Sequence, residues 1–256
     1  MNLPQHIRSR DNPLIKRLRQ LTQDNTAYRK LGQVWLEGDH LCRALLVRGG
    51  RPVQAVFTEA GWQRAPDVLR RACAHNTIVS ETLMATVSGL ESPADMGFVL
   101  ALPALAGLVP GQPAVVLDRV QDAGNVGSIL RSAGAFGFRQ VLAIRGTAAL
   151  WSPKVVRAGM GAHFGLRLVE GLAPADLAGL GLPLLVTSSH RGQWLHRATL
   201  PWPCAWVMGH EGQGVAPQIE AMAADAVRIA QPGGEESLNV AAAAAICLHA
   251  SAATTP

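Results

Sequence analysis

The 256-residue sequence has few charged residues and no long apolar run. Charged residues make up 16% of the chain and hydrophobic residues 48%, a composition typical of an ordered globular protein and not of a disordered or fibrous one. The longest uninterrupted apolar stretch, from Val240 to Leu248, is far shorter than the roughly 20 residues that a membrane-spanning helix needs. We therefore expect a folded cytoplasmic protein with no membrane segment and no secretion signal.

Several motifs that would indicate other functions are also missing. The four cysteines, Cys42, Cys73, Cys204 and Cys247, show no CxxC or His/Cys ligand spacing, which argues against a zinc site or a disulfide framework. We expect them to be reduced packing residues and expect no bound metal. A dinucleotide-dependent oxidoreductase would need a GxGxxG loop, and a P-loop enzyme would need GK[ST]; the sequence offers neither.

Positive charge is concentrated at the N-terminus. Residues 1–51 contain ten Lys and Arg against four Asp and Glu, whereas the other 205 residues are nearly neutral. Leu14, Ile15, Leu18 and Leu21 have helical spacing within residues 8–21, and most of the basic residues there lie off that apolar face. The pattern predicts an exposed basic helix that contacts RNA phosphates through Arg8, Arg10, Lys16, Arg17 and Arg19. A solvated basic helix without a partner is the alternative.

The chain reads as two α/β domains. In residues 1–105, short apolar runs (33–36, 53–57, 77–79 and 97–102) alternate with helix-like segments (39–47, 66–75 and 80–86). Residues 106–113 belong to a stretch rich in proline and glycine that we interpret as a linker. In residues 114–256, strand-like runs (114–117, 141–144, 166–169, 182–187, 204–208 and 226–230) alternate with helical segments and end in a helix over 237–252. This alternation predicts a mostly parallel sheet with helices on both faces and a ligand site at the carboxyl ends of its strands.

Three motifs follow strand-like runs in this second domain. They are LDRVQDAGNVGSILR (117–131), WVMGHEGQGV (206–215) and IAQPGGEESLNV (229–240). Taken singly, each has an ordinary structural explanation: Asn125 as a helix cap with Arg131 as a surface ion-pair partner, the Gly-rich segment around Glu211 as a tight turn, and Ser237 as the N-cap of the last helix. Their common position after strands makes them candidates for a binding site instead.

In order and content, the three motifs resemble those of the SpoU (TrmH-type) RNA ribose 2'-O-methyltransferases of the SPOUT superfamily. The resemblance spans residues 114–256. The segments SRDNPLIKRLRQL and WLEGDHLCRALL are similar, more loosely, to the substrate-binding domain that many ribosomal-RNA members carry, a domain related to ribosomal proteins that bind kink-turns.

The resemblance implies S-adenosylmethionine as cofactor and RNA as partner. It assigns the adenosine part of the cofactor to the main chains of Gly209, Ile229 and Leu238, with Thr187 and Ser188 lining the same pocket. It places the methylated ribose near Asn125, Arg131, Glu211, Ser237 and Asn239. It also implies a deep trefoil knot around the pocket and a homodimer whose sites are completed across the interface.

Two alternatives remain within this family. The first is a catalytically inactive RNA-binding member, although none of the five polar positions is lost. The second is a transfer-RNA enzyme, but these usually have short extensions in place of the N-terminal domain. We therefore expect ribosomal (23S) RNA as the substrate, an expectation that rests on domain analogy.

Overall fold

The computed structural model describes residues 3–104, 107–188, 191–234 and 237–253, and its chain forms two compact units. The first comprises Met1–Ala104 and Trp151–Phe164, and the second comprises Leu105–Leu150 and Gly165–Pro256. The sequence pattern assigns residues 151–164 to the second domain, whereas their contacts lie within the first unit. The predicted boundary between the first domain, which ends at residue 105, and the linker, which begins at residue 106, falls on residues outside the described ranges.

The first unit contains a mixed five-stranded sheet in the order β1-β4-β3-β5-β2. Strands β1, β4 and β3 are parallel to one another, and β5 runs antiparallel to both β3 and β2. The strands are β1 (Gln5–Ile7), β2 (Gln33–Glu37), β3 (Gln54–Thr58), β4 (Asn76–Val79) and β5 (Met96–Ala101). The four apolar runs predicted in this region correspond to β2, β3, β4 and β5, whereas the three-residue strand β1 was not predicted.

The helices of this unit follow local sequence signals. They are α1 (Pro13–Gln23), α2 (Ala27–Leu31), α3 (Asp39–Val47), α4 (Glu59–Arg64), α5 (Asp67–Arg70), α6 (Glu81–Ala85) and α8 (Pro153–Gly159), followed by the 3-10 helix η1 (Ala162–Gly165). Asn12 caps α1 by accepting a hydrogen bond from the Leu14 N–H at 2.9 Å, and Pro13 suits the first helical position. The helix predicted over 66–75 ends at Arg70, whose carbonyl accepts a hydrogen bond from Asn76 Nδ2.

Helix α1 buries the predicted apolar stripe but is less exposed on its basic side than expected. Arg17 and Arg19 are half-buried and donate hydrogen bonds to Gln54 and Thr86, respectively. Their positions flank the stripe, so their long aliphatic stems pack against the unit while the guanidinium groups reach its polar atoms. Arg8 and Arg10 are exposed, as predicted.

The second unit is built on a seven-stranded sheet in the order β10-β12-β9-β11-β6-β7-β8, in which every strand pair is parallel. The strands are β6 (Ala114–Leu117), β7 (Gln140–Ile144), β8 (Arg167–Leu172), β9 (Leu184–Thr187), β10 (Gln193–Trp194), β11 (Ala205–Met208) and β12 (Asp225–Arg228). The predicted parallel sheet is therefore confirmed, and only the two-residue strand β10 was not predicted.

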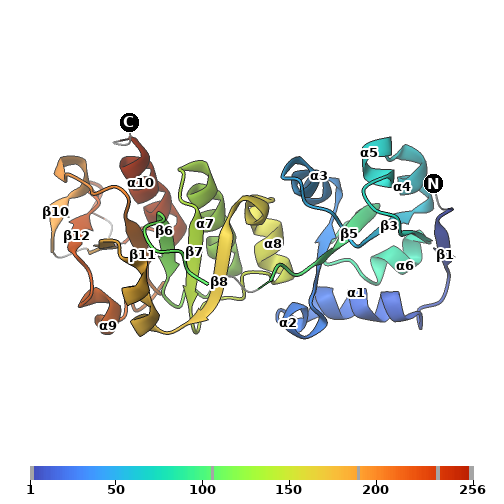
Figure 1. Ribbon diagram of the computed structural model, residues 1–256, viewed down its shortest axis with the longest axis horizontal. Helices are drawn as coiled ribbons and strands as arrows, with labels where there is room; N and C mark the ends of the chain where they lie inside the picture. Colours follow the sequence, from blue (N-terminus) through green and yellow to red (C-terminus); the bar gives the residue numbers. More distant parts are fainter. Residues whose placement is uncertain (1–2, 105–106, 189–190, 235–236, 254–256) are drawn as a thin grey trace. The chain divides into compact units, whose positions relative to one another are not determined.

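The helices and 3-10 helices that connect these strands are α7 (Ala123–Ala135), η2 (Pro174–Leu180), η3 (Leu195–Arg197) and α9 (Pro217–Glu220), and α10 (Val240–Ala253) follows the last strand. Helices α7 and α10 pack against each other beside β6 and β11 (Figure 1). The indole N–H of the fully buried Trp206 on β11 donates to Ser251 Oγ on α10 at 2.9 Å, which fixes the last helix to the sheet. The arrangement leaves the carboxyl ends of the central strands to form the site.

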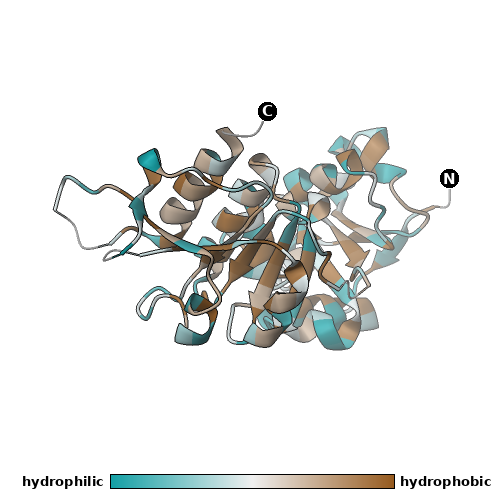
Figure 2. Ribbon diagram, turned by 60° about the vertical axis from the view of Figure 1, so that its left-hand side comes forward, coloured by the Kyte–Doolittle hydropathy of each residue, from teal (hydrophilic) through white to brown (hydrophobic). Residues whose placement is uncertain are grey.

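Apolar strands form the interior of each unit, as the brown strands in Figure 2 indicate. Cys42, Cys204 and Cys247 are buried, and all four cysteines are free thiols, as predicted. Burial raises the pKa of the Cys204 thiol to about 11 and that of Cys247 to about 12, so both are inert packing groups. In the part of the chain that the structure describes, no helix is both long and apolar enough to cross a membrane.

Candidate functional site

A hollow of about 660 Å³ lies where three neighbouring strands, β12, β9 and β11, reach their carboxyl ends. Its wall is formed by the residues that follow these strands and by the start of α10. It includes all five residues predicted to hold a cofactor and three of the five predicted around the ribose: Thr187, Ser188, Gly209, Ile229, Leu238, Glu211, Ser237 and Asn239. The topology thus brings the second and third motifs together, although they are distant in sequence.

The Gly-rich motif forms a tight loop at this wall. His210 and Gly214 pair through two backbone hydrogen bonds, of 3.0 and 2.8 Å. A Cβ atom on Gly209 would lie 2.4 Å from the backbone of Gly214 and Val215, so only glycine allows the loop to fold back this closely. The side chain of His210 stabilises the turn, because its Nδ1 accepts hydrogen bonds from the Gly212 and Gln213 N–H groups.

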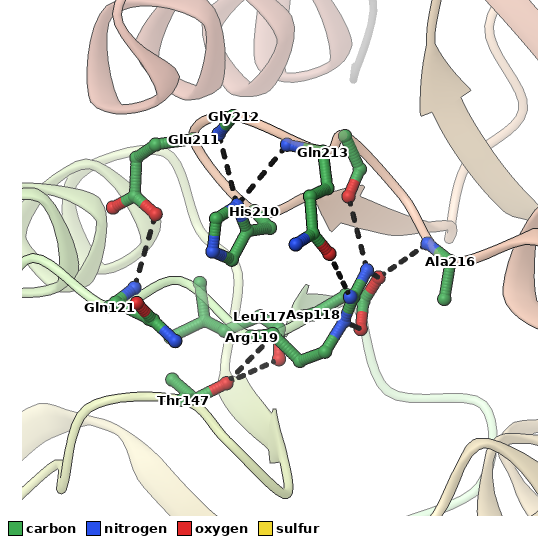
Figure 3. Close-up of polar contacts among 11 residues, drawn as sticks. Leu117, Asp118, Arg119, Gln121, Thr147, His210, Glu211, Gly212, Gln213 and Ala216 are labelled. Carbon is green, nitrogen blue, oxygen red and sulfur yellow. Dashed lines mark hydrogen bonds and ion pairs between the residues drawn. The ribbon is translucent and has the colours of Figure 1, made fainter.

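Glu211 connects this loop to the first motif. Its carboxylate accepts hydrogen bonds from the backbone N–H groups of Gln121 and Asp122 at 3.2 and 3.1 Å, and from Asn125 Nδ2 at 3.2 Å (Figure 3 shows the contact with Gln121). Burial acts to raise the pKa of Glu211, but these hydrogen bonds, together with one from its own backbone, outweigh it and lower the pKa. The tight turn around Glu211 is therefore also an anchor for the start of α7.

Asn125 extends the network to the third motif. Its Oδ1 accepts a hydrogen bond of 3.0 Å from Asn239 Nδ2, and Asn239 Oδ1 in turn accepts from the N–H groups of Ala241 and Ala242. Asn239 is therefore the N-cap of α10, and the alternative interpretation of Ser237 as this cap is wrong. The interpretation of Asn125 as a cap is also wrong, because Asp122 caps α7 by accepting from the Asn125 N–H at 2.7 Å.

Arg131 lies apart from this network. It is exposed on α7, it does not line the hollow, and its guanidinium has no hydrogen bond or ion pair with any residue that the structure describes. The surface ion pair that we considered for Arg131 is thus absent among those residues. A planar fork of free donors suits an external phosphate or carboxylate.

Asp118 is a residue of this site that we did not single out. It follows β6, is completely buried, and accepts a hydrogen bond of 2.6 Å from the Ala216 N–H of the Gly-rich loop. An acidic residue directly after an all-apolar strand, at the carboxyl edge of a predicted parallel sheet, is the sequence signal that would have identified it.

The wall of the hollow suits a polar organic ligand more than a bare ion. Gly209 lines the hollow without a side chain, and Gln231 adds a buried Oε1 that has no partner within the described ranges. An acceptor of this kind can bind an amino group of a ligand. The volume lies within the range of about 300–1,000 Å³ that is usual for small-molecule sites.

Comparison with known proteins identifies the family. The model of the SpoU rRNA Methylase family matches residues 112–249. An uncharacterized tRNA/rRNA methyltransferase of Synechocystis is 31% identical over 98% of this chain and 96% of its own, and a 23S rRNA (guanosine-2'-O-)-methyltransferase of Bordetella pertussis is 32% identical over 80% and 79%. An AdoMet-bound rRNA methyltransferase from Sinorhizobium meliloti superposes with a TM-score of 0.81 at 25% identity, covering 96% of each chain. The chain belongs to the SpoU rRNA methylase family.

Proposed function

We propose that this protein is an S-adenosylmethionine-dependent methyltransferase that acts on the ribose 2'-hydroxyl of RNA, with ribosomal RNA as its substrate. The observation that carries the proposal is the hollow at the ends of β9, β11 and β12, where the predicted cofactor residues and three of the predicted ribose residues form one wall. Named relatives support the substrate, since the Bordetella pertussis protein is a 23S rRNA methyltransferase that acts on a guanosine 2'-oxygen.

The residues of the hollow fit the proposed cofactor. The main chains of Gly209, Ile229 and Leu238 would hold its adenosine part, and the unpartnered Gln231 Oε1 suits the amino group of an adenine ring. Thr187 and Ser188 contribute polar groups at the neighbouring strand end. The bound sulfonium cofactor supplies an electrophilic methyl group, so the reaction needs no metal.

The protein has to orient the ribose and favour loss of the 2'-hydroxyl proton. Glu211, Asn125 and Asn239 form a hydrogen-bonded series from the Gly-rich loop to α10, which fixes these side chains before substrate arrives. In this proposal Ser237 and Asn239 hold the ribose. Arg131 orients the adjacent phosphate and stabilises the developing alkoxide through charged donors, and it does not act as a base, because a guanidinium keeps its protons.

A second copy of the chain would bring Arg131 into a complete site. The exposed residues of α10 are Ala242, Ile246, His249 and Ala253, which share one face of the helix, and Ile246 remains 41% exposed. Three of these four residues are apolar, and a largely apolar exposed face is typical of an interface. We therefore extend the proposal to a homodimer in which α10 and the exposed side of α7 take part.

The first unit is proposed to bind the RNA outside the reaction site. Arg8, Arg10 and Lys16 are exposed basic residues on its surface, although Lys16 already pairs with Asp11 at 3.0 Å. Arg17 and Arg19 are half-buried, so they offer RNA less accessible charge than Arg8 and Arg10 do. A hollow of about 640 Å³ in this unit is lined by Arg51, Arg70 and Arg71; the last two share an ion pair with Asp67, and the remaining positive charge suits phosphate.

Two features of the family's fold are also part of the proposal. Strand β11 inserts between β6 and β9, the chain then continues to β12 on the other side of β9, and α10 returns to pack against α7. This order supports a trefoil knot around the hollow. The mixed sheet of the first unit, flanked by helices, supports a relationship to ribosomal proteins that bind kink-turns.

Purified protein, isotope-labelled S-adenosylmethionine and RNA test the proposal. Label should enter ribosomal RNA, and it should not enter a substrate whose target nucleotide lacks the 2'-hydroxyl. With saturating RNA, Arg131→Lys keeps the charge but loses the fork and should lower kcat at least tenfold. Transfer to a base atom, or to transfer RNA alone, would contradict the proposed reaction or substrate, and a wild-type kcat in Arg131→Lys would remove Arg131 from the chemical step.

A further inference from the structure

The Gly-rich loop over residues 209–216 is held from two sides. Glu211 ties its first half to the start of α7, as described above. Its second half, residues 213–216, is held by a different pair, Asp118 and Arg119, at the end of β6 (Figure 3). Neither residue belongs to the polar set that the family resemblance assigns.

Arg119 has an unusual backbone conformation for its residue type. Its φ of 59° lies in the left-handed region, which non-glycine residues rarely adopt. Thr147 supports this turn, because its hydroxyl accepts a hydrogen bond from the Arg119 N–H and donates one to the Leu117 carbonyl. Gly146 leaves room for the arginine stem, since a Cβ there would lie 3.2 Å from Arg119 Cγ. Strained conformations of this kind persist where side-chain contacts offset them, and they are frequent at functional sites.

The side chain of Arg119 makes contacts in two directions. Its Nε and Nη2 donate to the two oxygens of the fully buried Asp118 carboxylate at 2.9 and 3.1 Å. Its Nη1 donates to Gln213 Oε1 at 2.9 Å, and Nη2 also reaches the Gly214 carbonyl at 3.3 Å. Asp118 completes the arrangement by accepting from the Ala216 N–H. The pair thus links β6 to three residues of the loop.

Only a guanidinium can make all of these contacts together. A planar fork with donors on three nitrogens can pair with a carboxylate and still reach outward, whereas a lysine ammonium is a single point charge. Gln213 and Gly214, the two loop residues that Arg119 contacts, also line the hollow. The shape of this part of the wall therefore depends on Arg119 directly.

We propose that Arg119 is a positioning residue that holds residues 213–216 in the shape that binds S-adenosylmethionine. The inference rests on the proposed function, and it adds a residue that acts through the loop and not on the reacting atoms. Because Glu211 holds the other half of the loop independently, loss of the Arg119 contacts should weaken cofactor binding more than it slows the chemical step.

The test compares three variants of the full chain. Arg119→Lys keeps a positive charge beside the buried Asp118, so the variant should fold, but it loses the simultaneous contacts to the loop. Gln213→Ala removes one loop contact and leaves the buried pair intact. Arg145→Lys is the matched control, because Arg145 follows β7 and donates to the Gly171 carbonyl, away from the Gly-rich loop.

Calorimetric titration with S-adenosylmethionine, steady-state kinetics and thermal unfolding are measured for each variant. Arg119→Lys should raise the Kd and the KM for the cofactor about tenfold, which corresponds to about 1.4 kcal/mol. Its kcat at saturating cofactor and its KM for RNA should stay within about twofold of wild type. Gln213→Ala should shift the same two constants in the same direction by a smaller factor, and Arg145→Lys should leave them unchanged.

The outcomes separate this inference from the proposed function. If wild type fails to bind S-adenosylmethionine, the proposed function falls, and this role of Arg119 with it. If wild type binds and Arg119→Lys binds equally well, only the role of Arg119 is overturned. A lower Tm in Arg119→Lys without any change in Kd would likewise overturn it, because Arg119 would then be purely structural.

Discussion

Among single residues, Glu211 offers a test by pH, because three hydrogen-bond donors from the first motif converge on its carboxylate. They lower its pKa in the folded protein below the unfolded value of about 4.3, despite burial. Its charge therefore stabilises the fold above about pH 4.3, and this contribution is lost as pH falls through the folded pKa.

Glu211→Gln removes this titration. Wild type should be more stable than Glu211→Gln near neutral pH, and the difference should shrink as pH falls from about 7 to about 3. Denaturant unfolding at a series of pH values measures it. A stability difference that stays constant over this range would show that the carboxylate charge is not what holds the loop.

The variant Gly209→Ala tests the close packing of the same loop. In Gly209→Ala the new methyl group would overlap the backbone of Gly214 and Val215, so the loop must open and the wall of the hollow must change. We expect at least tenfold weaker binding of S-adenosylmethionine in a titration. Gly179→Ala is the control, because a Cβ there meets only Leu108 at an ordinary 3.5 Å. Equal cofactor affinity in Gly209→Ala would contradict the loop geometry.

At the scale of elements, Asn239 at the start of α10 has two roles: it caps the helix, and it is proposed to hold the ribose. Asn239→Ser keeps an oxygen that can cap the helix but loses the amide that donates to Asn125, whereas Asn239→Ala loses both. The alanine variant should lose about 0.5–2 kcal/mol of stability and the serine variant much less. Both should lose methyl transfer. Full activity in the stable serine variant would leave Asn239 with capping alone.

The exposed face of α10 tests the proposed dimer. Ile246→Glu places a charge at the centre of this largely apolar face, where burial against a second copy would be costly. The variant should sediment as a monomer under conditions in which wild type sediments as a dimer, and it should lose activity while keeping its helical circular dichroism. A wild-type protein that is monomeric and active would contradict the homodimer.

The bounds of the helices and strands can be compared with those that the sequence predicts. Segments with strong local signals were predicted well: the helix over 39–47 has the predicted bounds, and the apolar runs became the central strands. Short edge strands such as β10 carry too few residues for a pattern. Ser237 and Asn239 both suit an N-cap; in the structure Asn239 Oδ1 makes the capping bonds, and its Nδ2 also contacts Asn125 across the fold. The contacts of Asp118 and Arg119 with the loop are likewise long-range.

At the scale of the whole molecule, the basic first unit predicts how RNA affinity depends on salt. Replacement of the exposed Arg10 by alanine should weaken binding of ribosomal RNA and reduce the slope of log K against log salt by about 1. Arg43→Ala removes the same charge from a residue already paired with Asp39 at 2.7 Å and should change the slope less. Filter binding at several salt concentrations measures both. Equal slopes for wild type and Arg10→Ala would exclude a phosphate contact at Arg10.

The central claim is methylation of a ribose 2'-hydroxyl in ribosomal RNA, and mapping of 2'-O-methyl groups tests it most directly. Ribosomal and transfer RNA are compared from cells with the gene, without it, and without it but expressing Asn239→Ala. The account predicts that one 2'-O-methyl in ribosomal RNA disappears with the gene and returns only with the wild-type protein. Unchanged ribosomal RNA, or loss of a methyl group from transfer RNA alone, would contradict it.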